Sequence, residues 1–386
     1  MAKAKKQLSS RITLESLKEK YEGSGVLADI RVEEDEELWV PSSSPVLNYM
    51  LGGGAAYGRI MEIAGKESSG KSLMALDFIH SAQSLGGVGI YVDAEMAFST
   101  TWAEKNGLDL DEIFLYQENG IESISDFVAE SCLYYRTQLV DNEPIVLVVD
   151  SIAALETFAA MNSSEKDAKA EMGGRAKALY KMLRLRNRLW AKLGITVIFI
   201  NQLRDTIATG FAAKFADKET TPGGNAMKFY ASQRIYLEAK KQLTSGSGEK
   251  KHRYGVEVLL TMKKNKLAMP KTPRRISVIF DDEYGKLGFD RFEGLAEIVA
   301  KEEALEKSGN SFILDGETIA TSLSGLQSVL ETDKEKRQDI LQKAGIMTIP
   351  EMRLRLKELD SNRYPADAVK YEVATKSSED EDEEDD

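Results

Sequence analysis

Apolar and polar residues alternate along the middle of the chain in two distinct patterns. Short continuous apolar runs, typical of strands buried on both faces of a parallel sheet, lie at residues 60–64, 88–92, 145–149 and 195–200. Between these runs, apolar residues at helical spacing predict helices over 72–85, 100–105, 121–139 and 175–193. The alternation predicts an α/β fold with a parallel central sheet flanked by helices on both faces.

The patterns on either side of this core are weaker. Two further strands are predicted over 231–237 and 256–262, with a turn at 245–248. Beyond residue 288, helical spacing is found over 295–305, 319–330, 333–344 and 350–359, with a hairpin near 312–318. A short helix is predicted near the start, with Thr13 as its N-cap and Gly23 as its end. We therefore expect an N-terminal segment (1–40), a core (41–290), a small α/β C-terminal domain (291–371) and a tail (372–386).

Composition narrows the class of protein. Of the 386 residues, 42% are hydrophobic and 30% are charged, and no apolar run approaches the roughly 20 residues that a membrane helix needs. The basic N-terminus lacks the apolar segment of a signal peptide. The single cysteine, Cys132, excludes an internal disulfide and a multi-cysteine zinc site. These features favour a cytoplasmic protein without a membrane partner.

Negative charge is concentrated at the C-terminus. Residues 379–386 are all acidic, so two thirds of the net charge of −12 lies in this block. Such a block is typical of a disordered, solvated tail. Basic stretches elsewhere can therefore still bind nucleic-acid phosphate, with the tail as a competitor.

The first apolar run leads into a phosphate-binding pattern, G-x-x-x-x-G-K-S, between a predicted strand and a predicted helix. Its glycines let successive N–H groups point toward one anion, and the helix adds its positive N-terminal end. Lys71 supplies a charge for the β- and γ-phosphates, and Ser72 supplies a hydroxyl ligand for Mg²⁺. A glycine-rich turn without nucleotide is the alternative, which the flanking strand and helix disfavour. The predicted nucleotide-binding residues are Gly65, Lys66, Glu67, Ser68, Ser69, Gly70, Lys71 and Ser72.

Polar residues follow the other predicted strands, at the sheet edge where ligands of parallel sheets bind. Asp150 suits Mg²⁺ coordination, although a strand-end cap is the alternative for an isolated acid. Glu95 is a candidate to activate the attacking water, although a lone glutamate would be unremarkable. Gln202 could contact the γ-phosphate and pass the nucleotide state to the long loop that follows it.

Two long loops and the helix between them are candidates for nucleic-acid binding. The loops are predicted at 158–172 and 203–224, and the intervening stretch 175–192 carries seven basic residues and no acids. A solvated cationic face is the alternative for the helix alone. Beside two such loops, a phosphate backbone is the better interpretation.

Taken together, residues 15–290 resemble the RecA family of DNA strand-exchange proteins, including its phage-encoded relatives. The matching stretches are GRIMEIAGKESSGKS, YVDAE, VVDSIAAL, IFINQLR, TTPGGNAMKFYAS and KNKLAMP. GGNAMKFYAS and KNK are the most specific to bacterial-type RecA, whereas the phosphate loop is shared by many ATPases. The resemblance implies an ATP- and Mg²⁺-dependent recombinase that forms filaments on single-stranded DNA, pairs it with homologous double-stranded DNA and hydrolyses ATP when DNA is bound.

The resemblance also implies roles at the nucleotide. Glu95 activates water, Asp150 holds Mg²⁺ and Gln202 senses the γ-phosphate. Trp102 falls where the family has an aromatic residue against adenine. Ser99 stands where the family has an aspartate, which implies looser recognition of the base.

Further implied roles concern neighbouring subunits and DNA. Lys264 and Lys266 match a pair that reaches ATP on the adjacent subunit, and Phe229 falls where the family couples the subunit interface to ATP. The segment 14–30 resembles a helix and strand that pack on the next subunit, and single-strand-binding and mediator proteins are candidate partners. The second loop is longer than in cellular RecA around 209–217, which leaves duplex engagement open. The implied DNA-binding residues are Met172, Arg184, Arg204, Ile207, Gly223, Gly224 and Asn225.

Two alternatives share the same ATPase core. A ring-shaped helicase should carry an arginine finger and lack GGNAMKFYAS and KNK. A mediator paralogue that loads other recombinases often lacks the water-activating acid or the DNA loops, and this chain retains both.

Overall fold

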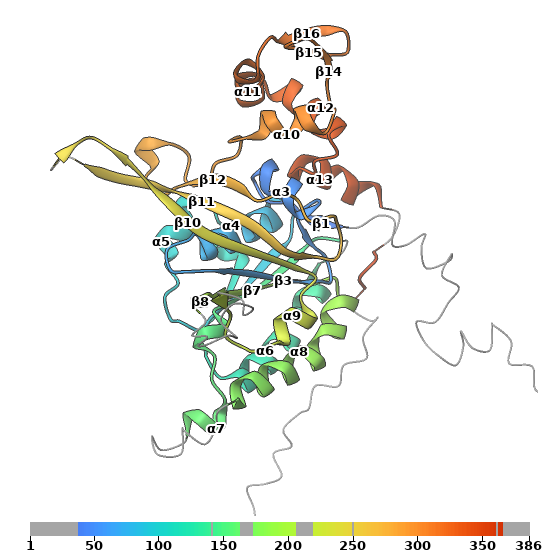
Figure 1. The fold of residues 1–386 in the computed structure, drawn as a ribbon. Helices are drawn as coiled ribbons and strands as arrows, with labels where there is room; N and C mark the ends of the chain where they lie inside the picture. Colours follow the sequence, from blue (N-terminus) through green and yellow to red (C-terminus); the bar gives the residue numbers. More distant parts are fainter. Residues whose placement is uncertain are drawn as a thin grey trace, which may run out of the picture. The chain divides into compact units, whose positions relative to one another are not determined.

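Figure 1 shows the computed structural model, which describes residues 38–139, 142–162, 173–205, 219–248, 251–359 and 362–365. The chain divides into two compact units, Met1–Leu38 and Trp39–Asp386, and every element named below belongs to the second. The predicted helix near Thr13 and the acidic tail lie outside the described residues. The expected domain boundaries at residues 40, 290 and 371 stay predictions.

The predicted parallel sheet is confirmed. Its strands are β3 (Ile60–Gly65), β4 (Val88–Asp93), β5 (Ile113–Tyr116), β6 (Ile145–Asp150), β7 (Thr196–Gln202) and β10 (Gln233–Ser245). Each is parallel to its neighbours in the order β10-β3-β7-β6-β4-β5, and β5 is a strand that the sequence pattern did not predict. The carboxyl ends of β3, β4, β6 and β7 therefore meet at one edge of the sheet.

Antiparallel strands extend this sheet beyond β10. They are β11 (His252–Asn265), β12 (Arg274–Ile279) and β13 (Gly288–Phe289), so that the described residues form one sheet of nine strands. The strands predicted over 231–237 and 256–262 are confirmed but too short, because β10 and β11 continue as a long two-stranded ribbon to a tip at the predicted turn.

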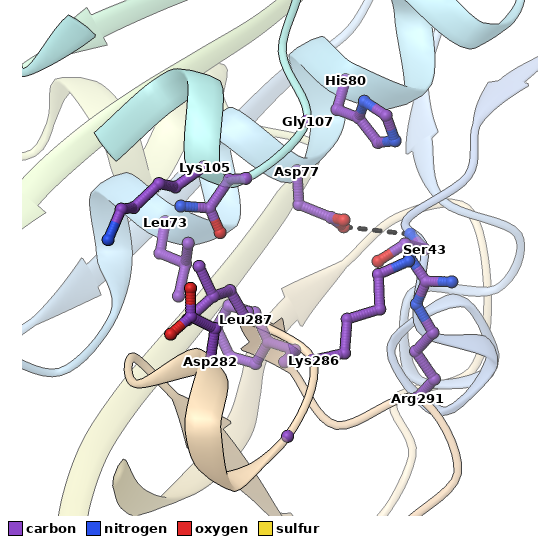
Figure 2. Close-up of a pocket in the computed structure, with 14 residues that line it drawn as sticks. Ser43, Leu73, Asp77, His80, Lys105, Gly107, Asp282, Lys286, Leu287 and Arg291 are labelled. Atoms are coloured by element: carbon purple, nitrogen blue, oxygen red, sulfur yellow. Dashed lines mark hydrogen bonds between the residues drawn. The ribbon is translucent and has the colours of Figure 1, made fainter. Parts of the chain in front are cut away.

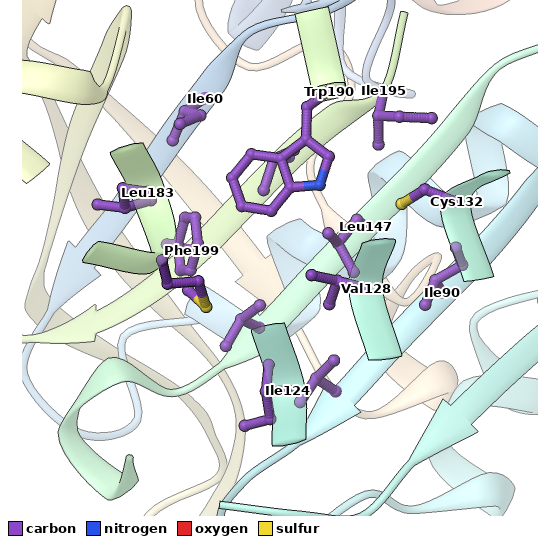
Figure 3. Close-up of a cluster of buried hydrophobic side chains, with 14 of the residues drawn as sticks. Ile60, Ile90, Ile124, Val128, Cys132, Leu147, Leu183, Trp190, Ile195 and Phe199 are labelled. Atoms are coloured by element: carbon purple, nitrogen blue, oxygen red, sulfur yellow. The ribbon is translucent and has the colours of Figure 1, made fainter. Parts of the chain in front are cut away.

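Helices cover both faces of the sheet, as expected. They are α4 (Lys71–Ser84), α6 (Ile121–Gln138) and α8 (Gly174–Lys192). On β4, a Cβ at Gly89 would lie 2.6 Å from Ile79 of α4, so α4 packs against that face. The next residue, Ile90, points to the opposite face and joins the core beneath α6 and α8. In that core, shown in Figure 3, Trp190 of α8 packs near Phe199 of β7.

The C-terminal part contains α10 (Leu295–Lys301), β14 (Glu306–Ser308), β15 (Ser311–Leu314), β16 (Glu317–Ala320), α11 (Leu323–Thr332), α12 (Lys334–Lys343) and α13 (Ile349–Glu358). The hairpin predicted near 312–318 is confirmed by the antiparallel pairing of β15 with β16. The helix predicted over 319–330 is wrong at its start. Residues 317–320 form β16, and α11 begins after Ser322, whose Oγ accepts a hydrogen bond from the Gly325 N–H at 3.1 Å. The helix predicted over 295–305 ends at Lys301, before Glu303 with its φ of 55°.

Shorter elements complete the described chain. They are β1 (Trp39–Val40), α3 (Pro45–Leu51), β2 (Ala55–Ala56), α5 (Thr100–Lys105), α7 (Phe158–Met161), β8 (Arg204–Asp205), β9 (Glu219–Thr220) and α9 (Ala226–Tyr230), with 3₁₀ turns at Leu110–Glu112, Ile152–Ala154 and Asp282–Tyr284. Within the described ranges, no helix is both long and apolar enough to cross a bilayer.

Candidate functional site

The phosphate-binding loop connects β3 to α4, as the sequence predicts. Gly70 has a φ of 89°, a left-handed conformation that glycine adopts without a steric penalty. A Cβ on Gly65 would lie 2.4 Å from Ser69 Oγ and 2.6 Å from the Leu237 carbonyl oxygen, so a side chain there would displace backbone. The buried Ser69 hydroxyl donates to the Lys66 carbonyl at 2.8 Å and holds the turn. This loop shape fits a bound phosphate chain.

Lys71 and Ser72 occupy the first turn of α4. The Lys71 ammonium donates to the Lys66 carbonyl at 2.8 Å, so this hydrogen bond leaves its charge uncompensated. Burial lowers the pKa of Lys71, and the carboxylates of Asp150, Glu95 and Glu67 oppose that shift. A phosphate at the loop would stabilise the charged form of this side chain.

Ser72 and Asp150 come together beside the loop. The Ser72 hydroxyl donates to Asp150 Oδ2 at 2.7 Å, and the Tyr91 hydroxyl donates to the same oxygen at 2.6 Å. Burial raises the pKa of Asp150, although these two hydrogen bonds lower it in part. A hydroxyl and a carboxylate next to a phosphate loop fit Mg²⁺, which binds few protein oxygens and takes further ligands from the nucleotide. Sequence reasoning missed Tyr91; the available signal was its place in YVDAE, on the strand that neighbours Asp150.

Glu95 and Gln202 also come together, from the ends of two different strands. The Gln202 Nε2 donates to Glu95 Oε1 at 3.4 Å, and the Ser151 hydroxyl donates to the same oxygen. The Glu95 side chain is exposed beside the phosphate loop's Lys71, whose pKa it affects. The expected water activator and γ-phosphate sensor are therefore direct neighbours. Ser151, which follows Asp150 through a cis peptide bond, was not expected.

A buried aspartate shapes the turn that carries Glu95. Asp93 is 2% exposed, and its carboxylate accepts the Ala97 N–H at 3.0 Å and the Phe98 N–H at 2.9 Å. The Gln117 side-chain amide donates to the same carboxylate at 3.1 Å. This aspartate was missed because one strand-end acid in YVDAE cannot be told from the next without the fold.

Helix α5 carries Trp102, the residue that we expect to contact adenine. Ser99 is its N-cap, and the Ser99 hydroxyl accepts the Trp102 N–H at 3.2 Å. The half-exposed Trp102 ring lies in the first turn. The serine that departs from the family pattern therefore caps the helix, and the contact of Trp102 with a base stays a prediction.

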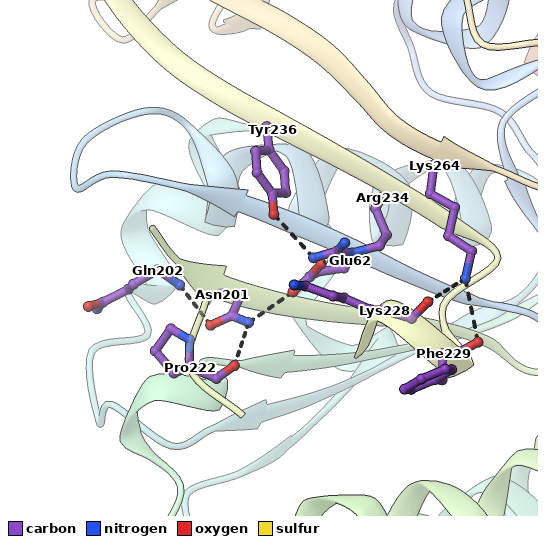
Figure 4. A network of polar contacts seen from close by, with 9 residues as sticks. All are labelled: Glu62, Asn201, Gln202, Pro222, Lys228, Phe229, Arg234, Tyr236 and Lys264. Carbon is purple, nitrogen blue, oxygen red and sulfur yellow. Dashed lines mark hydrogen bonds and ion pairs between the residues drawn. The ribbon is translucent and has the colours of Figure 1, made fainter. Parts of the chain in front are cut away.

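A buried network, shown in Figure 4, links the sensor to the end of the second loop. Asn201 donates to Glu62 Oε1 at 2.9 Å and to the Pro222 carbonyl at 3.1 Å, and its side-chain oxygen accepts the Gln202 N–H at 3.0 Å. Glu62 is fully buried and pairs with Arg234 at 2.5 Å. Removing one partner of such a pair leaves an uncompensated buried charge. The network was missed because Glu62 and Arg234 are 172 residues apart.

The two lysines expected to reach a neighbouring subunit lie on the other side of this network. Lys264 donates to the Lys228 carbonyl at 2.6 Å and to the Phe229 carbonyl at 3.4 Å, at the end of α9 (Figure 4). Burial lowers the pKa of Lys264, and the charges of Lys266 and Arg234 lower it further. Phe229 is 69% exposed and Lys266 is exposed. Among the described contacts, none joins these lysines to the phosphate loop of the same chain.

The predicted DNA loops are described in part. Residues 158–161 form α7 rather than loop because the Thr157 hydroxyl caps it, accepting the Ala160 N–H at 3.1 Å. The second loop is closed at its base by the pairing of β8 with β9, which places exposed Arg204 at its start. Met172 and Ile207 lie outside the described residues.

The far end of the second loop packs against the basic helix. Gly223 and Gly224 have φ values of 88° and 65°, and Asn225 follows them as the N-cap of α9. A Cβ on Gly223 would lie 2.7 Å from a Leu179 methyl group on α8. The loop end and α8 therefore form one surface.

Two of the basic residues on α8 are paired and others form an exposed stripe. Arg175 pairs with Glu156 at 2.5 Å and Arg186 with Asp126 at 2.8 Å. Four exposed cations repeat at intervals of three or four positions and so share one face of α8: Lys177, Lys181, Arg184 and Arg188. The spacing of this stripe suits a phosphate backbone.

Comparisons with known proteins agree with this site. The family model for the RecA N-terminal domain matches residues 9–284. Protein RecA of Macrococcus caseolyticus is 34% identical over 331 residues, which cover 84% of this chain and 86% of the relative. Protein RecA 2 of Myxococcus xanthus is 36% identical over 327 residues, covering 82% and 85%, and Protein RecA of Gloeobacter violaceus is 31% identical over 369 residues, covering 95% and 90%. The chain belongs to the RecA family of ATP-dependent recombinases, which act in DNA recombination and repair.

Proposed function

We propose that this chain couples ATP hydrolysis to DNA strand exchange through the contact between Glu95 and Gln202. This contact is the observation that carries the proposal. It joins an exposed carboxylate beside the phosphate loop to the residue at which β7 ends and the second loop begins. Glu95 then faces the reacting phosphate, and Gln202 leads directly into the second loop, which binds DNA.

At the nucleotide, each residue has a separate task. The N–H groups of the phosphate loop and the Lys71 ammonium bind the phosphates of ATP. Ser72 and Asp150 would hold Mg²⁺, which supplies positive charge at the transferred phosphate. Glu95 orients a water molecule and accepts its proton as the water oxygen attacks the γ-phosphorus, while the bond from that phosphorus to the bridging oxygen breaks and ADP leaves. Lys264 and Lys266 of an adjacent subunit complete the charge around the transition state, so turnover requires self-association into filaments.

Gln202 exchanges partners between Glu95 and the γ-phosphate. Because the Asn201 side chain accepts the Gln202 N–H and donates to the Pro222 carbonyl, a shift of Gln202 alters the closure of the second loop. That loop and the stripe on α8 bind single-stranded DNA and then a homologous duplex. The segment 1–40 packs on the next subunit, and single-strand-binding and mediator proteins act on the filament.

ATP hydrolysis with and without long single-stranded DNA, with electron microscopy of the same samples, tests this function. We expect strong stimulation by DNA together with helical filaments. Rings with stimulated turnover would favour the helicase, and DNA binding without stimulated turnover would favour the mediator.

A further inference from the structure

A cationic pocket lies outside the nucleotide site, where the linker between β13 and α10 meets the start of α12. Its volume is about 340 Å³. Lys286, Arg291, Lys334, Arg337 and His80 line it, and no carboxylate does among the described residues. A second pocket of about 360 Å³ shares His80, Lys286 and Arg291 with it. Figure 2 shows the Lys286 and Arg291 side chains beside Ser43, with His80 and Asp77 on the neighbouring helix α4.

Within the described residues, the positive charges of this pocket are not paired with carboxylates. In the described part of the chain, no ion pair reaches Lys286, Arg291, Lys334 or Arg337. Arg337 donates to two neutral groups, the Leu330 carbonyl at 2.8 Å and the Glu331 carbonyl at 3.1 Å. Its guanidinium also lies over the Phe292 ring, 4.9 Å from the centroid. Four formal charges therefore converge without compensation by a carboxylate in the pocket wall.

The pKa values of two pocket cations reflect this crowding. Burial lowers the pKa of Lys286 and of Arg337, and the charge of Arg291 lowers both further. Asp77 and Asp333 oppose these shifts from outside the 340 Å³ pocket. The Asp77 carboxylate is engaged by the Ser43 N–H at 3.0 Å. An anion in the pocket would relieve repulsion that the protein itself leaves in place.

The chemistry of the pocket favours phosphate. Two guanidinium groups can each present paired N–H donors to phosphate oxygens, which lysines alone cannot do. A concave site of this size suits a small ligand, whereas a DNA backbone binds along an extended stripe such as that on α8. We propose that this pocket binds a small phosphorylated anion, a free polyphosphate or the phosphates of a nucleotide, between Arg291 and Arg337.

Such a ligand would connect two parts of the chain. Arg291 and Lys286 precede α10, Arg337 and Lys334 belong to α12, and His80 belongs to the helix that starts at the phosphate loop. A bound anion would hold these elements together and stabilise the folded chain by mass action.

Calorimetric titration of inorganic pyrophosphate into the full chain tests this proposal. Each protein is titrated with and without Lys71→Ala, so that binding at the phosphate loop is recognised by its loss and no added nucleotide competes for the pocket. We expect binding with a rise in melting temperature, and at least tenfold weaker binding in the double variant Arg291→Gln/Arg337→Gln. Lys357→Gln, an exposed cation of α13 outside the pocket, is the matched control and should bind like the wild type.

Lys334→Gln keeps the test informative if the double variant misfolds. The Lys334 side chain is exposed, so its loss should weaken binding several-fold without altering packing. ADP titrated in the same way separates the two sources: tighter binding of ADP indicates a nucleotide, and tighter binding of pyrophosphate indicates a free polyphosphate. Equal affinity in wild type, Lys334→Gln and the double variant would overturn the proposal. Binding that appears only after truncation at Lys376 would also overturn it and identify the acidic tail as the occupant.

Discussion

Each central strand has a buried apolar portion and a polar carboxyl end, and these two portions contribute differently to stability and activity. Residues Ile145–Val149 of β6 are buried and apolar, and the strand then ends in Asp150, whose pKa is raised mainly by burial. Strand β7 changes in the same way, from buried Phe199 to Asn201 and Gln202. The apolar portions pack against α6 and α8, whereas the polar ends hold partly desolvated charges at the phosphate loop. Stability and activity should therefore respond to different substitutions in the same strands.

The largest effect is expected in the core that the apolar portions of the strands form with α8. Trp190 is 1% exposed and packs with its ring centroid 6.3 Å from that of Phe199. Trp190→Ala should lower the free energy of unfolding by about 3–5 kcal/mol, because it leaves a cavity. Urea denaturation measures this loss, and Trp190→Phe is the milder control. A loss below about 1 kcal/mol for the alanine variant would contradict the assignment of this core.

At the phosphate loop, a substitution should reduce activity without reducing stability. Lys71→Ala should reduce ATP hydrolysis at least about 100-fold, or roughly 2.7 kcal/mol of transition-state stabilisation, because phosphate charge goes uncompensated. Its melting temperature should not fall, since burial opposes the charge of Lys71. Steady-state hydrolysis and thermal unfolding of one preparation test both, with Lys357→Ala as a control at an exposed cation. Normal turnover would overturn the site assignment.

A smaller effect is expected at Gln202, the polar end of β7 that contacts Glu95. Gln202→Ala removes the donor to Glu95 but leaves the phosphate loop intact. We expect the stimulation of hydrolysis by single-stranded DNA to fall about tenfold, while nucleotide affinity stays within about twofold. Binding of a fluorescent ATP analogue supplies the second measurement. Retained stimulation would show that the sensor lies elsewhere.

The pH dependence of stability distinguishes Asp150 from a structural acid. A raised pKa means that the folded chain favours the protonated carboxyl, so stability is lost as pH rises from about 4 through the raised pKa. Asp150→Asn should therefore melt with the wild type at low pH and above it at neutral pH, while hydrolysis is lost. Thermal melts across this range measure the gap. A variant less stable than the wild type at neutral pH would contradict the prediction that the buried charge of Asp150 lowers stability.

Sequence predicted those parts of the fold and site that depend on local pattern. The apolar runs located β3, β4, β6 and β7, and the strand ends located Asp150, Glu95 and Gln202. It did not predict partners that meet through strand pairing, such as Tyr91 with Asp150 or Glu62 with Arg234, because neither side chain reveals its neighbour strand. The start of α11 was misplaced for a different reason: the apolar residues of β16 continue the helical spacing, and only the cap at Ser322 separates them.

The smallest effect is expected from the acidic residues at the C-terminus, which belong to neither portion of the central strands. Truncation after Lys376 removes the eight acidic residues 379–386, which we expect to compete with DNA phosphate for the cations of α8. We expect duplex DNA to bind a few-fold faster at low salt, and the difference to shrink as salt screens the charges. Stopped-flow association at several salt concentrations measures both. Replacing the same eight residues by a neutral Gly-Ser segment should reproduce the truncation, because charge rather than length sets the effect. Unchanged association at low salt would remove the tail from DNA binding and leave the stripe on α8 accessible in the full chain.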